Sequence, residues 1–207
     1  MIYGRLARLN LWMRCLIDWK DNHLLKLIII LNFIFYAAVS NAAELLPFSC
    51  EINSDSIAKI KLDTRLNQIK KIYPTAKLTR TSDGDGAALV LLTVNNQELA
   101  IIYANEDNPD APIDLSNKIE AIVTFNFACK SKFGIGPGTT VKKAASLLGG
   151  IEDIMLSEIE SREFIEFKKQ PKNLIYQIDY CGNFKNDIRH TKKYQQGCKI
   201  LSIGVSK

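Results

Sequence analysis

The sequence has few of the residues on which catalytic and metal sites depend. It contains 2 histidines among 207 residues and no Cys-x-x-Cys pair of the kind that binds zinc. His190 is the only histidine after residue 43, and its lysine-rich surroundings offer no evident carboxylate to orient it. Residues 134–140 are rich in glycine, but they lack the lysine and the spacing of a P-loop. We therefore predict a tight turn for this segment. We therefore expect no metal site and no other cofactor.

The net charge is too low to favour a nucleic-acid partner. The whole chain carries +5, but residues 1–43 contain five basic and two acidic residues, so the remainder carries only +2. Hydrophobic residues make up 47% and charged residues 24% of the chain, as in an ordinary packed protein. This composition predicts a folded domain rather than a disordered one.

Residues 1–43 are typical of a signal peptide. Basic residues precede an apolar run at 24–39, and small residues follow it, so we expect cleavage after Ala42 or Ala43. The run is shorter than the roughly 20 apolar residues that span a bilayer. An uncleaved N-terminal anchor remains the alternative, and it would be the chain's one route to the membrane. The long leader also leaves open whether Met13 is the true start.

The cysteine pattern predicts disulfides and an oxidising location. Cys15 lies in the leader, and the rest of the chain keeps Cys50, Cys129, Cys181 and Cys198. An even number of cysteines in an exported chain implies disulfide bonds, here with three possible pairings. We favour Cys181 with Cys198, which would close a hairpin loop, and Cys50 with Cys129. We expect the protein to be periplasmic or secreted.

An internal duplication organises the chain. Shifting the sequence by 75 residues superimposes 64–74 on 139–149, and both segments repeat apolar residues at the spacing of a buried helical stripe. Thr139 is placed to cap the second helix, and Pro74 and Gly149 are placed to end the two helices. A repeated helix therefore marks two related units.

Strand-like segments follow each helix with the same offset. Residues 88–92 and 99–103 superimpose on 163–167 and 174–178, and 118–122 superimpose on 199–203 after six extra residues; 77–79 and 153–155 add a strand each. We predict an α+β fold made of two tandem units, each a helix followed by a four-stranded antiparallel meander. The units occupy residues 44–128 and 129–207.

This arrangement resembles the fold of the β-lactamase inhibitor proteins, which a small family of outer-membrane assembly lipoproteins shares. Two helix-plus-four-strand units of about 75 residues, in an exported chain with four cysteines, carry the resemblance. The apolar pattern places the helices on one face of the sheet, and the residues expected to point toward them are Val90, Leu92, Leu99, Ile101, Tyr103, Ile165, Phe167, Leu174, Tyr176 and Ile178. No shared motif allows binding residues to be transferred.

The sheet face turned away from the helices is the first candidate for partner binding. We expect it to be apolar in the first unit and mostly polar in the second; the outward residues would be Leu89, Leu91, Ala100 and Ile102, then Glu166, Lys168, Gln177 and Asp179. An apolar exposed sheet face marks a binding surface. The alternative is that Leu45, Leu46 and Phe48 lie across it.

Two loops of opposite charge are the second candidate. Residues 105–114 form an acidic loop in the first unit, and the equivalent loop of the second unit is basic, with Lys185, Arg189, Lys192 and Lys193. Loops of opposite charge at equivalent places would give the two edges of the molecule opposite charges. The basic loop would then steer an acidic partner.

These observations favour a binding or inhibitory module that acts on a protein of the cell envelope through its sheet surface. An envelope-assembly scaffold is one alternative. A carboxylate-based hydrolase is another, and a deep pocket with two facing carboxylates would favour it.

Overall fold

The computed structural model describes residues 50–82, 86–104, 106, 108–158, 161–185 and 188–207. The chain divides into Met1–Leu45 and Leu46–Lys207, and every described residue belongs to the second of these units. The leader predicted at 1–43 lies outside the described residues. Within the described ranges, no helix is long and apolar enough to cross a membrane.

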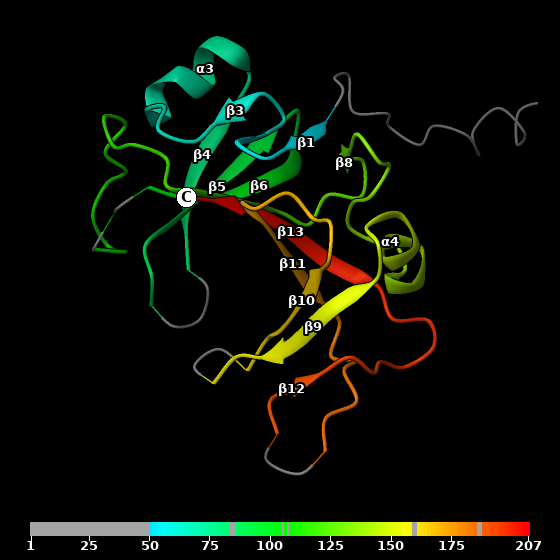
Figure 1. Cartoon of the computed structure of the whole chain (residues 1–207). Helices are drawn as coiled ribbons and strands as arrows, with labels where there is room; N and C mark the ends of the chain where they lie inside the picture. The colour runs from blue at the N-terminus through cyan, green and yellow to red at the C-terminus, as the bar shows by residue number, and fades with distance from the viewer. Residues whose placement is uncertain (1–49, 83–85, 105, 107, 159–160, 186–187) are drawn as a thin grey trace, which may run out of the picture. The chain divides into compact units, whose positions relative to one another are not determined.

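A nine-stranded antiparallel sheet forms the larger layer of the fold (Figure 1). Its strands lie in the order β12-β9-β10-β11-β13-β7-β6-β5-β4. Their bounds are β4 Lys77–Thr81, β5 Leu89–Val94, β6 Gln97–Tyr103, β7 Ala121–Thr124, β9 Ile151–Leu156, β10 Glu163–Phe167, β11 Leu174–Ile178, β12 His190–Thr191 and β13 Ile200–Ser206. The eight predicted strands are all present, and β12 extends the sheet beyond them at one edge.

A second layer of short elements covers one face of this sheet. Among the described residues it contains two helical segments, η2 continuing into α3 and the separate α4, and a four-stranded sheet of order β3-β2-β1-β8, in which β1 and β8 run parallel. The bounds are β1 Glu51–Asn53, β2 Ser56–Ile57, β3 Ile60–Lys61, β8 Lys130–Ser131, the 3-10 helix η2 Leu66–Gln68, α3 Ile69–Ile72 and α4 Val141–Leu147. The fold is therefore richer in strands than the α+β prediction implied.

The hydrophobic core lies between the two layers. Leu66 and Val141 of the helices are fully buried together with Val90, Phe167 and Tyr176 of the large sheet. The rings of Phe167 and Tyr176 meet edge to face, with their centroids 5.3 Å apart. Burying a side chain of this size stabilises the fold by roughly 1.5–3 kcal/mol. The predicted inward residues of β5, β10 and β11 are confirmed.

The first half of the large sheet consists of β4–β7 and the second half of β9–β13, and each is linked to its helical segment by a similar hydrogen bond. In the first half, the backbone N–H of Ile119 donates to the carbonyl oxygen of Thr64 at 2.9 Å. In the second half, the N–H of Ile200 donates to the carbonyl oxygen of Thr139, also at 2.9 Å. The helices η2–α3 and α4 begin 75 residues apart. Each helical segment is thus preceded by a threonine whose carbonyl oxygen accepts a backbone N–H from the large-sheet side.

The cap of the second helix differs by one residue from the prediction. Thr140, not Thr139, is the N-cap, and its hydroxyl oxygen accepts the N–H of Lys143 at 3.3 Å. The Thr139 hydroxyl instead accepts the N–H of Gly136 at 3.1 Å. Thr139 therefore stabilises the turn before the helix, as the glycine-rich segment predicted.

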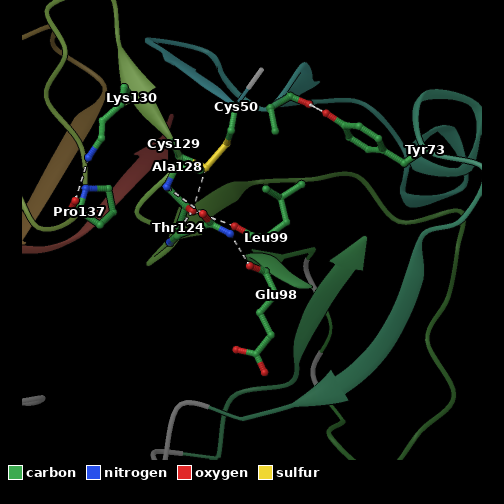
Figure 2. The surroundings of a disulfide bond; sticks show 11 residues. Cys50, Tyr73, Glu98, Leu99, Thr124, Ala128, Cys129, Lys130 and Pro137 are labelled. Carbon is green, nitrogen blue, oxygen red and sulfur yellow. Dashed lines mark hydrogen bonds between the residues drawn. A yellow bond between two sulfur atoms is a disulfide. The ribbon is translucent and has the colours of Figure 1, made fainter. Parts of the chain in front are cut away.

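Two disulfides fasten the second layer and the end of the large sheet. Cys50 is bonded to Cys129 across 79 residues, and Cys181 is bonded to Cys198 across 17 (Figure 2 shows the first). The favoured pairing is confirmed. Stable disulfides form outside the reducing cytosol, so the two bonds point to an oxidising, exported environment.

Candidate functional site

A groove of about 440 Å³ crosses the outer face of the large sheet, the face turned away from the helices. Strands of both halves contribute to it. Its lining residues are Leu89, Ile101, Tyr103, Ala121, Val123, Phe125, Arg162, Phe164, Ile175, Gln177, Ser202, Gly204, Val205 and Ser206. The lining is mostly apolar, and the groove is open to solvent on one side.

The floor of the groove runs along β13 and has small side chains. Ser202, Gly204 and Ser206 alternate along this strand, so they share its outer face. Gly204 pairs with Val123 of β7 on one side and with Ile175 of β11 on the other. A glycine within a strand often marks a place where another molecule approaches the backbone closely.

Larger side chains form the two walls. Ile101 and Val123 are paired neighbours on one side, and Phe125 continues that wall with 43% of its surface exposed. On the other side lie Phe164 and Ile175, the latter 44% exposed. The small side chains along β13 thus lie between two rows of bulky side chains, and this difference in size produces the groove.

A β-bulge in β6 determines which residues face the groove. The register shifts between Leu92 and Thr93 of β5, so that Leu92 pairs with Ala100 and Thr93 with Glu98. Leu99 is left without a partner across the strand, and the inside-outside alternation reverses there. As a result, the second part of β6 turns its alternate residues the opposite way from the prediction.

The prediction for Ile102 was therefore wrong. Ile102 is 0% exposed and pairs with Val90, whose side chain faces the core. Ile101 and Tyr103, which we expected to point toward the helices, line the groove instead. The sequence shows alternation but not the bulge, so it could not assign the two faces of this strand.

Leu89 and Leu91 lie on the outer face as expected. Leu89 lines the groove although only 1% of its surface is exposed. Leu91 is half-buried and pairs with Ile101. Both residues thus belong to the groove or its border.

The outer face of the second half is less polar than predicted. Phe164 and Ile175 both contribute apolar surface to the groove. Gln177 does lie there, where its side-chain oxygen accepts a hydrogen bond from the Ser202 hydroxyl at 3.0 Å. Glu166 is exposed beside the groove. The apolar surface therefore continues across the junction between the two halves.

Few ionisable groups border the groove. Among the described residues that line it, Arg162 carries the one permanent charge, and none is a carboxylate or a histidine. The described part of the chain also holds no cluster of three or more histidine, cysteine or acidic side chains that could bind a metal ion. The groove can therefore offer apolar contact with a few hydrogen bonds at its border.

The predicted basic loop lies against the outermost strands of the second half. Arg189 Nε lies 3.1 Å from a carboxylate oxygen of Glu158, and Lys192 Nζ lies 3.6 Å from one of Glu152. Lys185 and Lys193 are exposed. Ion pairs at the surface contribute about 0–1 kcal/mol each, but they reduce the field that this loop presents to a partner.

His190 does have a carboxylate partner, so that expectation was wrong. Its Nδ1 lies 2.6 Å from Oδ2 of Asp153, because β12 pairs with β9 at the edge of the sheet. The imidazole is 62% exposed and does not line the groove. The pair therefore fastens an edge strand.

The loop of the first half makes the equivalent contact with opposite charges. Arg80 of the edge strand β4 forms an ion pair with Glu106 of the acidic loop and donates to the carbonyl oxygen of Ala111 at 2.8 Å. Hydrogen bonds from Ser116 lower the pKa of Asp114 in the same loop. The loop before the last strand thus binds the edge strand β4 in the first half, whereas in the second half it contains the edge strand β12 and binds β9.

The comparisons with known proteins identify a fold but no family. No family model matches the sequence, and no curated protein matches it. The chain is similar to the crystal structure of the uncharacterized protein yfeY from Escherichia coli, with a TM-score of 0.50 and 11% sequence identity. The similarity covers 77% of this chain and 100% of that chain. It establishes a known fold, while the specific resemblance to β-lactamase inhibitor proteins stays a prediction.

Proposed function

We propose that this protein is an exported binding module that holds an apolar segment of a protein partner in the groove along β13. The observation that carries the proposal is the strip of small side chains between bulky ones on the outer sheet face. Gly204 and its small neighbours lie between bulky rows that include Ile101 and Ile175, within a space of about 440 Å³. Exposed apolar surface of this kind marks interaction sites.

The shape of the groove favours a protein segment over an enclosed small molecule. A small-molecule site usually buries most of its ligand, whereas this groove is open to solvent on one side. Phe125 and Ile175 expose nearly half of their surfaces beside it. Arg162 and Gln177 add hydrogen-bonding groups at the border. Apolar contact with a polar border is the usual anatomy of a protein interface.

The absence of carboxylates from the described groove lining separates this proposal from the hydrolase alternative. A glycosidase-type site needs two carboxyl groups facing one another across the substrate. Inhibition would follow from binding if the segment held in the groove came from the active site of the partner.

We also propose that a single ancestral unit was duplicated to form the sheet. The bridge between Arg65 and Lys118 in the first half has its equivalent between Thr140 and Lys199 in the second. The turn before each helix contains a residue with a positive φ. This residue is Asp63 (63°) in the first half and Gly138 (80°) in the second. Equivalent backbone contacts, offset by 75 residues at the helices and by six more at their partner segments, support a common origin better than apolar patterning alone.

Site-specific photocrosslinking tests the binding proposal. A photoreactive amino acid replaces Ile175 in the groove wall and, as a control, Leu115, which is 39% exposed and whose backbone contacts the helical segment η2. We expect Ile175 to crosslink one protein of the envelope that Leu115 does not. Identical adducts at both positions, or none at Ile175, would contradict the proposal.

A further inference from the structure

A second surface, which shares no lining residue with the groove, combines lysines with an exposed aromatic ring. We call it the basic hollow. It is shallow and open, with a volume of about 540 Å³, and its described lining residues include Phe127, Lys130, Gly138, Lys143 and Lys199. None of the lining residues is acidic. Three lysines from different parts of the chain therefore meet here without a carboxylate in the lining.

Phe127 is held at the surface by the backbone of the hollow. It exposes 72% of its surface, the most of any large hydrophobic residue described. A Cβ at Gly138 would lie 2.6 Å from the ring, so the phenyl group packs closely on this glycine. Gly138 also has a φ of 80°, which favours glycine. The exposed position of the ring is thus built into the turn.

The lysines lie close enough to affect one another. Lys130 is half-buried, and its Nζ donates to the carbonyl oxygen of Pro137 at 3.0 Å (Figure 2). Burial lowers the pKa of Lys130, and the charge of Lys143 lowers it further. An anionic group in the hollow would relieve this repulsion.

The polypeptide enters the folded unit beside this hollow. Cys50, the first described residue, is bonded to Cys129, and its carbonyl oxygen accepts the N–H of Lys130 at 2.9 Å (Figure 2 shows Cys50, Cys129 and Lys130). Ten residues separate Cys50 from the apolar run at 24–39. Ten residues span at most about 35 Å. While a membrane holds the apolar run, before any cleavage, a tether of this length limits the distance between that membrane and the hollow.

We infer that the basic hollow docks on an anionic lipid bilayer. The lysines contact lipid phosphates, and Phe127 enters the interfacial region, where aromatic rings are favoured. An exposed ring among lysines, in a lining without acidic residues and next to a tether from an apolar segment, fits a lipid surface better than a soluble acidic protein. Docking would place the bilayer at the Cys50–Cys129 side of the second layer.

Hydrogen exchange on the full chain in lipid vesicles tests this inference. We compare phosphatidylcholine vesicles with vesicles that also contain phosphatidylglycerol, and we expect slower exchange in residues 127–143 only with the anionic lipid. Lys143→Gln with Lys199→Gln should weaken docking by roughly thirty-fold, about fivefold per lysine, and restore fast exchange. The control, Lys70→Gln with Lys71→Gln, removes the same charge from α3 and should leave the protection intact.

The lipid dependence decides the outcome. Equal exchange in both lipids, or an equal loss of protection in the α3 control, overturns the inference. Protection by inorganic phosphate alone, without anionic lipid, also overturns it, because the hollow would then be a site for a free anion. Failure of this experiment leaves the crosslinking test of the groove unaffected, since the two surfaces share no lining residue.

Discussion

Replacing Gly204 with valine should block the groove without unfolding the protein. A Cβ at Gly204 would lie 3.4 Å from Cγ2 of Val123 and 3.7 Å from Cβ of Ile175, which are tight but tolerable contacts. Glycine in a strand costs about 0.5–1 kcal/mol relative to alanine, and β-branched residues favour strands. We expect the tight contact to offset part of this gain, so Gly204→Val should change the free energy of unfolding by about 0 to +1 kcal/mol.

Gly136→Val is the matched contrast. A Cβ there would clash with the carbonyl oxygen of Cys129 and lie 2.6 Å from Cδ of Lys130, so backbone has to move. Such overpacking should destabilise the fold by at least about 1–3 kcal/mol.

Urea unfolding compares the two variants through their midpoints, provided that the dependence of stability on urea is unchanged. Gly204→Val should also abolish the crosslink from Ile175. The reasoning is refuted if Gly204→Val is as unstable as Gly136→Val, or if Gly136→Val unfolds like the unmodified protein.

Two further predictions concern stability. Removing a disulfide by paired Cys→Ala substitutions should lower the free energy of unfolding by about 4.5 kcal/mol for Cys50–Cys129 and by about 3 kcal/mol for Cys181–Cys198. The longer loop costs more because it restrains the unfolded chain more. Denaturant unfolding measures both losses, and the reverse order would contradict the loop-length argument. Burial raises the pKa of Tyr176 to about 12 from 10.0, so the unfolded chain ionises first and stability should fall between these pH values. Tyr176→Phe should lessen that fall by an amount on the order of 2–3 kcal/mol, and an unchanged alkaline unfolding profile would contradict it.

The long strands and the two helical segments were predictable because their apolar residues recur at regular spacing. The two-residue turn at Asn95 and Asn96 was also predictable, and both residues have positive φ values, 51° and 62°, as this hairpin turn requires. The cysteine pairing followed from the short loop between Cys181 and Cys198. Local signals were thus sufficient for these features.

The small sheet and the groove were not predictable from the same signals. β2 and β3 have two residues each, too few to show any alternation. The groove depends on the register of several strands at once, and the bulge at Leu99 reverses one of them. Gly204 offered a clue, since a glycine inside a strand needs an explanation, but its neighbours in space are far away in sequence.

The position of β13 has a consequence for how the protein folds. This strand is the last along the described chain, yet it lies between β11 and β7 in the middle of the large sheet. Until it arrives, both of those strands present unpaired backbone edges, which are prone to pair with other chains. Closing the large sheet therefore depends on β13, and blocking this strand would expose two long edges at once.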